Sequence, residues 1–195
     1  TTDETGATTM EVESFDYIIQ MGEIFEQVWL FFMDTLDFDP PVSDPMDNND
    51  LYNIYVENLP SYYFGITYTS NYNELPQFCS SFIKMRNSYS ASQFNIHTEI
   101  ENIKVTAVHE FFHSIQFSYN CFERLWLMEA TAVWSEDQLF NNINDLYRYL
   151  GSWFSNCNFK SINDESNHMY GSFIYFQYLD EHLGGPEIIK NIWDH

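Results

Sequence analysis

Residues 101–117 read ENIKVTAVHEFFHSIQF, and their apolar spacing predicts an amphipathic helix over residues 100–117. Four apolar residues form one stripe at helical spacing: Val108, Phe111, Phe112 and Ile115. Three polar residues lie together on a neighbouring face: His109, His113 and Gln116. The helix therefore has one side suited to a hydrophobic core and another suited to a site.

The segments on either side of this helix predict an α+β fold. An earlier amphipathic helix is expected over residues 11–36, before Pro40 and Pro41, which cannot continue it. Runs of β-branched and aromatic residues predict strands over residues 51–57, 62–68 and 80–85. Loops are expected over residues 37–50 and 87–97, and further helices over residues 125–140, 143–154, 170–183 and 186–193. Strands first and helices second favour α+β, with an N-terminal helix and small β-sheet before a mainly helical region.

Length and charge limit the possible classes of protein. The chain has 195 residues, which corresponds to one domain, with a strand-rich lobe over residues 1–98 and a helical lobe over residues 99–195. Seven Lys and Arg against 29 Asp and Glu give a net charge of −22, which argues against nucleic acid and anionic lipid as partners. The apolar stretches are far shorter than a membrane span, so we expect a soluble globular protein and no membrane partner.

The cysteines and the N-terminal residues do not determine the cellular compartment of the protein. Cys79, Cys121 and Cys157 are an odd, sparse set, so one disulfide with one free thiol and three reduced thiols both fit. Residues 1–6 show no signal-peptide pattern, and the missing initiator Met fits a longer precursor. The excess of acidic residues with few lysines favours an extracellular setting without fixing it.

The loop over residues 37–50 is the one candidate for a calcium site. Its oxygen-bearing residues are Asp44, Asp47, Asn49 and Asp50. Their order does not match a calcium-binding loop, and no glycine stands at the sharp turn. A solvated turn is therefore favoured over a weak Ca²⁺ site.

The segment from His109 to His113 fits the pattern H-E-x-x-H. Residues four apart on a helix lie about 40° apart around the axis and about 6 Å along it, so both imidazoles can face one ion. Glu110, between them, can reach a water on that ion without ligating it. A random order of this composition gives only about 0.015 such matches. The alternative is a pair of buried structural histidines.

A zinc site of this type needs a third protein ligand and one open position. Glu129 is a candidate because it stands on an otherwise apolar turn, where an acid is costly unless it is paired or bound to metal. Ala130 and Ala132 beside it are small enough for two helices to approach closely. The alternative is a Glu on the surface.

H-E-x-x-H followed by W-L-x-E-x-x-A-x-W-x-E resembles the gluzincin metallopeptidases, the clan of thermolysin and the zinc aminopeptidases. The similarity extends along most of the chain and is closest to uncharacterised bacterial metalloproteases. Its pieces are Asp39–Pro41, Asp50–Val56, His109–Gln116, Leu127–Asp137 and His168–Gly171. The resemblance implies a zinc cofactor held by His109, His113 and Glu129, Glu110 as general base, and a peptide or protein substrate.

Two departures from the family pattern qualify this expectation. Fifteen residues separate His113 from Glu129, fewer than in the best-known members, and Val133 stands where the thermolysin pattern has an Asp. Glu136, seven after Glu129, instead matches the aminopeptidase-like pattern, and we expect it to accept the outer N–H of His109.

The remaining roles concern the transition state and the class of activity. We expect Tyr170, ahead of His168, to donate a hydrogen bond to the oxyanion. Without a G-x-M-E-N exopeptidase motif, an endopeptidase is favoured. The competing hypotheses are a zinc-holding domain that does not cleave and an acidic interaction domain whose histidines belong to the core.

Overall fold

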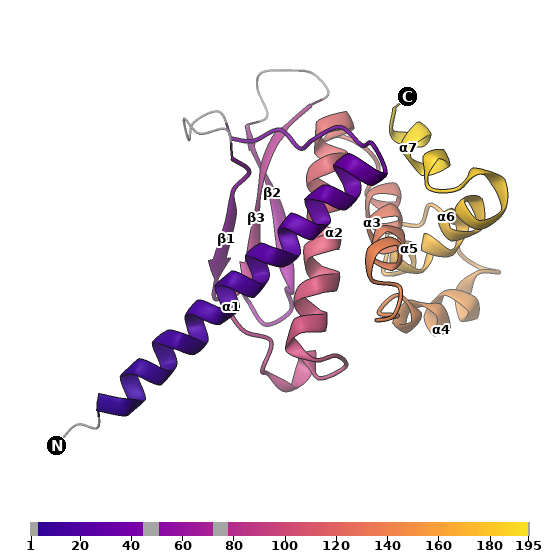
Figure 1. Ribbon diagram of the computed structural model, residues 1–195. Helices are drawn as coiled ribbons and strands as arrows, with labels where there is room; N and C mark the ends of the chain where they lie inside the picture. The colour runs from indigo at the N-terminus through magenta and orange to yellow at the C-terminus, as the bar shows by residue number, and fades with distance from the viewer. Residues whose placement is uncertain (1–3, 45–50, 72–77, 195) are drawn as a thin grey trace.

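The protein is described by a computed structural model that covers residues 4–44, 51–71 and 78–194, with side chains over residues 15–44, 51–70 and 78–194 (Figure 1). It begins with α1 (Glu4–Leu30), which continues as the π-helical turn η1 (Phe31–Thr35). The strands are β1 (Ile54–Glu57), β2 (Gly65–Asn71) and β3 (Ser80–Arg86), followed by the 3-10 turn η3 (Ser92–Phe94). The remaining elements are α2 (Glu99–Asn120), α3 (Leu125–Phe140), α4 (Tyr147–Asn156), α5 (His168–Gly171), α6 (Phe173–Leu179), the π-helical turn η4 (Asp180–Gly184) and α7 (Glu187–Trp193).

The sheet has the order β1-β3-β2, with β1 parallel and β2 antiparallel to the central strand β3. The helix α2 packs against β2 and β3, and α1 crosses α2 (Figure 1). The helices α3 to α7 lie on the other side of α2 from the sheet (Figure 1). A small β-sheet followed by a mainly helical region confirms the predicted α+β fold.

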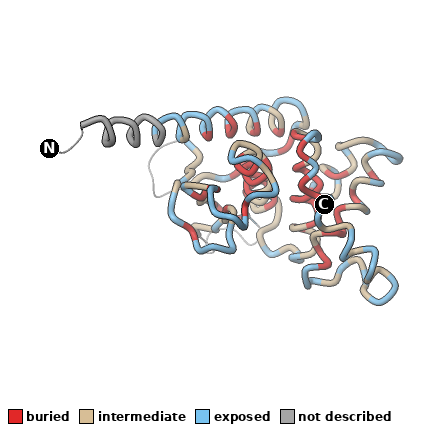
Figure 2. Tube along the Cα trace, turned by 90° about the horizontal axis from the view of Figure 1, so that it is seen from below, coloured by how far each residue is buried: buried red, intermediate tan, exposed pale blue. Residues whose placement is uncertain are grey.

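The sequence around α2 explains why this helix is central. Thr98 and Glu101 form a reciprocal capping box that satisfies backbone N–H groups at its start. The four residues of the predicted apolar stripe are at most 2% exposed: Val108, Phe111, Phe112 and Ile115. They join one hydrophobic cluster that includes α1, β3, α3 and the C-terminal helices. Figure 2 shows buried positions, in red, concentrated where the segments lie against one another, with exposed positions, in pale blue, along the outside.

The predicted helix over residues 125–140 has the same bounds as α3, and the predicted helix over residues 100–117 extends to Glu99 and Asn120. The one expected over residues 143–154 starts only at Tyr147, because Asn144 has φ 57°, in the left-handed region that ends or prevents a helix. The one expected over residues 170–183 is divided into α5, α6 and η4. Of the calcium candidates, Asp47, Asn49 and Asp50 lie outside the described residues.

Cys79 and Cys121 form a disulfide, and Cys157 is a free thiol. The bridge joins the residue before β3 to the residue after α2, where the Cys79 N–H also donates to the Phe117 carbonyl at 2.9 Å. Of the two alternatives left open by the sequence, one bridge with one free thiol is therefore present, and it fastens the C-terminal end of α2 to the sheet. Over the described ranges, no helix combines the length and apolarity needed to cross a bilayer.

Candidate metal centre

Three polar atoms from α2 and α3 converge in the interior of the helical region. His109 and His113 stand one turn apart on α2, and their Nε2 atoms are 3.1 Å apart. Glu129 comes from α3, and its Oε2 lies 3.2 Å from Nε2 of His109 and 3.6 Å from Nε2 of His113. The structure thus brings together the three residues that the sequence predicts as ligands.

The size of this triangle suits a tetrahedral zinc ion. Zinc bonds of about 2.0–2.2 Å at tetrahedral angles place neighbouring ligand atoms about 3.3–3.6 Å apart. The three observed separations, from 3.1 to 3.6 Å, bracket that range. Two imidazoles and one carboxylate are also the donor set of catalytic zinc sites with one open position. The residues present therefore fit the ion.

The orientation of His109 is set by Glu136. Nδ1 of His109 lies 2.7 Å from Oε1 of Glu136, which belongs to the same helix as Glu129 and is only 5% exposed. Burial raises the pKa of Glu136 to about 7, while the hydrogen bond to His109 favours its charged form. As a carboxylate it can only accept, so we assign the proton to Nδ1, which leaves the lone pair of Nε2 directed at the triangle. The contact expected from the sequence is present.

Gln116 has the same role for His113. Its amide nitrogen donates to the Met128 carbonyl at 2.8 Å and to the Thr131 hydroxyl at 2.9 Å, which orients the amide. Its Oε1 then accepts from Nδ1 of His113 at 2.8 Å, so Nε2 of this ring also carries a lone pair. The sequence placed Gln116 on the polar face of the helix, but its role depends on α3 and was not predicted.

The centre attracts positive charge. Burial alone would lower the pKa of His109, but its hydrogen bonds to the carboxylates of Glu129 and Glu136, and their negative charges, raise it well above its ordinary value. Burial would likewise raise the pKa of Glu129, but the charges of the two imidazoles, led by His113, lower it. Two lone pairs and a carboxylate held this close repel one another unless a proton or a metal ion lies among them.

Glu110 is held beside the triangle without belonging to it. Its Oε2 lies 2.8 Å from the hydroxyl of Thr67 on β2, the edge strand nearest α2. The same hydroxyl is 2.8 Å from the Glu110 carbonyl. A Cβ at Gly65 would come within 2.8 Å of Cγ of Glu110, so only glycine allows the strand to approach this closely. Sequence analysis missed Gly65 and Thr67 because both act across 43 or more positions of the chain.

The two predicted oxyanion donors have different surroundings. Tyr170 lines the same cavities as Glu110, and its ring stacks on Tyr149 at 5.2 Å. Burial, with the charges of nearby carboxylates, raises the pKa of Tyr170 to about 12, so it remains a neutral phenol that can donate. His168 is 4% exposed, stacks on Trp153 at 5.5 Å, and lines neither cavity. The structure therefore brings Tyr170 to the centre and leaves His168 apart from it.

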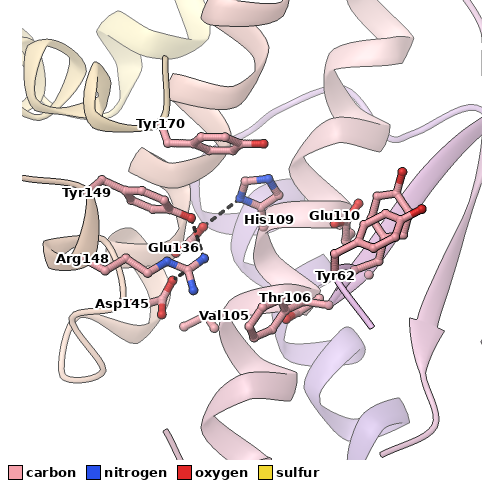
Figure 3. Close-up of a pocket in the computed structure, with 13 residues that line it drawn as sticks. Tyr62, Val105, Thr106, His109, Glu110, Glu136, Asp145, Arg148, Tyr149 and Tyr170 are labelled. Carbon is pink, nitrogen blue, oxygen red and sulfur yellow. Dashed lines mark hydrogen bonds and ion pairs between the residues drawn. The ribbon is translucent and has the colours of Figure 1, made fainter. Parts of the chain in front are cut away.

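Two cavities meet at this centre and share five lining residues: Tyr63, Gly65, His109, Glu110 and Tyr170. One, of about 340 Å³, extends to the start of α4 (Figure 3). There, Arg148 and Tyr149 face Glu110 across the cavity, with His109 between them (Figure 3). The other, of about 360 Å³, extends to the start of α3 and has an apolar wall made of Ile66, Phe117, Leu125 and Met128.

Replacing the partner of His109 is expected to weaken zinc binding without abolishing it. Glu136→Ala removes the group that holds the ring and its tautomer, and such partners contribute about 10- to 100-fold in metal affinity. The measurement is zinc competition against a chromophoric chelator. Asp137→Ala is the matched control, because this neighbouring carboxylate interacts with the charges of Glu181 and Asp180 and lines neither cavity at the centre. Unchanged affinity in Glu136→Ala would contradict the assignment.

Comparisons of the chain with protein-family models, with curated proteins and with solved structures give no significant match, so they assign it to no family.

Proposed function

We propose that this protein is a zinc-dependent peptidase in which His109, His113 and Glu129 hold the ion and Glu110 is the general base. The observation that carries the proposal is the triangle of Nε2, Nε2 and Oε2 atoms, 3.1–3.6 Å apart, with both outer imidazole N–H groups held by Glu136 and Gln116. Glu110 stands next to the triangle, and its carboxylate accepts a hydrogen bond from Thr67.

The roles of the chain's own residues follow from their positions. When bound, zinc would supply a water of lowered pKa and polarise the substrate carbonyl. Glu110 would accept the proton of the attacking water and deliver it to the leaving amine. The Thr67 hydroxyl would keep Oε2 of Glu110 in place, and Tyr170 would donate to the oxygen on which negative charge develops.

The shape of the cleft supports an endopeptidase. Cavities extend from Glu110 both toward α4 and toward α3, so a peptide has room on both sides of the bond to be cut. The Cys79–Cys121 disulfide also supports a protein that matures in an oxidising compartment, as secreted enzymes do.

The test combines metal content with cleavage of an unfolded protein. We expect one zinc ion per chain by mass spectrometry, loss of cleavage with a chelator, and recovery when zinc is restored. A protein that binds no zinc would overturn the proposal. Stoichiometric zinc without cleavage would favour the alternative of a zinc-holding domain that does not cleave.

The oxyanion donor is tested by a pair of variants. Tyr170→Phe keeps the ring stacked on Tyr149 but removes the donor, so kcat should fall about 10²- to 10³-fold while KM and zinc content stay nearly unchanged. His168→Ala changes a ring outside both cavities, so the folded fraction should retain its kcat. The opposite pattern would move the role to His168.

A further inference from the structure

Arg148 is the only Lys or Arg, among the described residues, that lines either cavity beside Glu110. It is the second residue of α4, and its side chain is 34% exposed. A chain with only seven Lys and Arg against 29 acidic residues thus places one of its cations inside the cleft.

The guanidinium of Arg148 is fixed in place by its neighbours. Its Nη2 lies 3.2 Å from Oδ2 of Asp145 and donates to the Tyr149 hydroxyl. The group also sits over the Tyr149 ring, 4.7 Å from its centre, and 5.4 Å from the centre of the Phe64 ring. Asp145 is itself held, because its Oδ1 is 2.9 Å from Nε2 of His97. A group held this firmly loses little further freedom when it binds a ligand.

The guanidinium of Arg148 has N–H groups that are not used in these contacts. Arginine carries five N–H donors, and both described polar contacts use Nη2 alone. Nε and Nη1, with three N–H groups, have no hydrogen-bond partner within the described part of the chain. The other charged groups of this cavity each have a partner: Glu136 has His109 through Oε1, Glu110 has Thr67, and Asp145 has His97 and Arg148. Oε2 of Glu136 is buried and has no hydrogen-bond partner among the described residues. A planar fork of N–H groups is suited to a carboxylate.

We propose that Arg148 binds a carboxylate of the peptide substrate, close to the bond that is cut. The inference rests on the proposed function, since it takes this cavity as the place where the peptide lies. Arg148 and Glu110 line one cavity of about 340 Å³, so the carboxylate belongs to a residue near the scissile bond. It is either the side chain of an Asp or Glu, which fits an endopeptidase, or the free C-terminus of the peptide, which would make the enzyme a carboxypeptidase instead.

The experiment measures binding without turnover. Fluorescent peptides of otherwise identical sequence are titrated against the zinc-loaded Glu110→Gln variant and followed by anisotropy. In one series a single Glu is placed at successive positions of the peptide, and each peptide is compared with the same peptide carrying Gln at that position. A second series compares a peptide that ends in a free carboxylate with the same peptide ending in an amide. Ionic strength is held constant, because the net charge of −22 repels every acidic peptide.

We expect one carboxylate position to bind about 10- to 100-fold more tightly than its neutral counterpart. If the Glu series shows the preference, the source is a side chain; if the acid–amide pair shows it, the source is the C-terminus. Equal binding of acidic and neutral peptides at every position, or no binding of any acidic peptide, would overturn the inference.

Variants of Arg148 and Arg124 test whether Arg148 binds the carboxylate or only supports the fold. When Arg148→Gln is combined with Glu110→Gln, the preference for the carboxylate should disappear, while the neutral peptides should bind as they do to Glu110→Gln alone. Arg124→Gln is the matched control, because Arg124 pairs with Glu165 and lines neither cavity. Equal weakening of acidic and neutral peptides by Arg148→Gln would show that Arg148 only supports the fold. If that variant does not fold, the peptide series on the Glu110→Gln protein still decides.

A separate assay distinguishes this inference from the proposed function. Wild-type, zinc-loaded protein is incubated with the acidic peptides and with their neutral counterparts. Their cleavage without any carboxylate preference would overturn the role of Arg148 and leave the peptidase proposal standing. No cleavage of any peptide, despite bound zinc, would count against the peptidase proposal, whereas the binding series would still give its own answer on Arg148.

Discussion

Glu129→Ala is expected to leave the protein without bound zinc after dialysis. The carboxylate supplies the only oxygen of the triangle and its only negative charge, at 3.2 and 3.6 Å from the two imidazole nitrogens. Without it, the neutral pair His109 and His113 would hold the ion alone. The loss of affinity should exceed the about 10- to 100-fold expected for a residue that only supports a ligand. Zinc per chain, measured by mass spectrometry, checks the result.

The control for this experiment is an acidic residue outside the centre. Glu181→Ala removes an exposed carboxylate of η4 and should retain one zinc ion per chain. His109→Ala and His113→Ala should behave like Glu129→Ala. Full zinc occupancy in Glu129→Ala would mean that the third ligand lies elsewhere, and the assignment of the whole triangle would then be wrong.

The parts of the site that the sequence predicts are those with a local cause. His109 and His113 face one point because a helix places residues four apart on the same side. Glu136 follows Glu129 by seven positions, which again returns to one side of a helix. The bounds of α3 were predicted for a similar reason, since apolar residues recur through the segment from Leu125 to Phe140.

The parts that were missed depend on contacts between distant segments. Thr67 reaches Glu110 only because β2 is the edge strand beside α2, and Gln116 needs the carbonyl of Met128 on α3. Arg148 enters the cleft because the preceding turn, with Asn144 in the left-handed region, sets where α4 begins. Spacing within one helix contains none of this information, and three cysteines allow several pairings.

Glu110→Gln is expected to lower kcat by about 10²- to 10⁴-fold while zinc binding stays normal. Glutamine has the same shape as glutamate, and its amide oxygen can still accept from Thr67. It has lost the ability to take a proton from water. Glu110 makes no described hydrogen bond to His109, His113 or Glu129, so its replacement should leave the triangle in place. Initial rates and zinc content of the same preparation are the two measurements.

A second variant at the same contact sharpens this test. Thr67→Val keeps the volume of the threonine and removes only the hydroxyl that holds Oε2 of Glu110, so its kcat should fall less than that of Glu110→Gln. Near-normal turnover in Glu110→Gln would remove the general base from the mechanism. Loss of zinc in Glu110→Gln would instead identify Glu110 as a ligand. If Glu110 is a general base positioned by β2, Glu110→Gln should keep its zinc and lose turnover. Thr67→Val should then show a smaller fall in kcat.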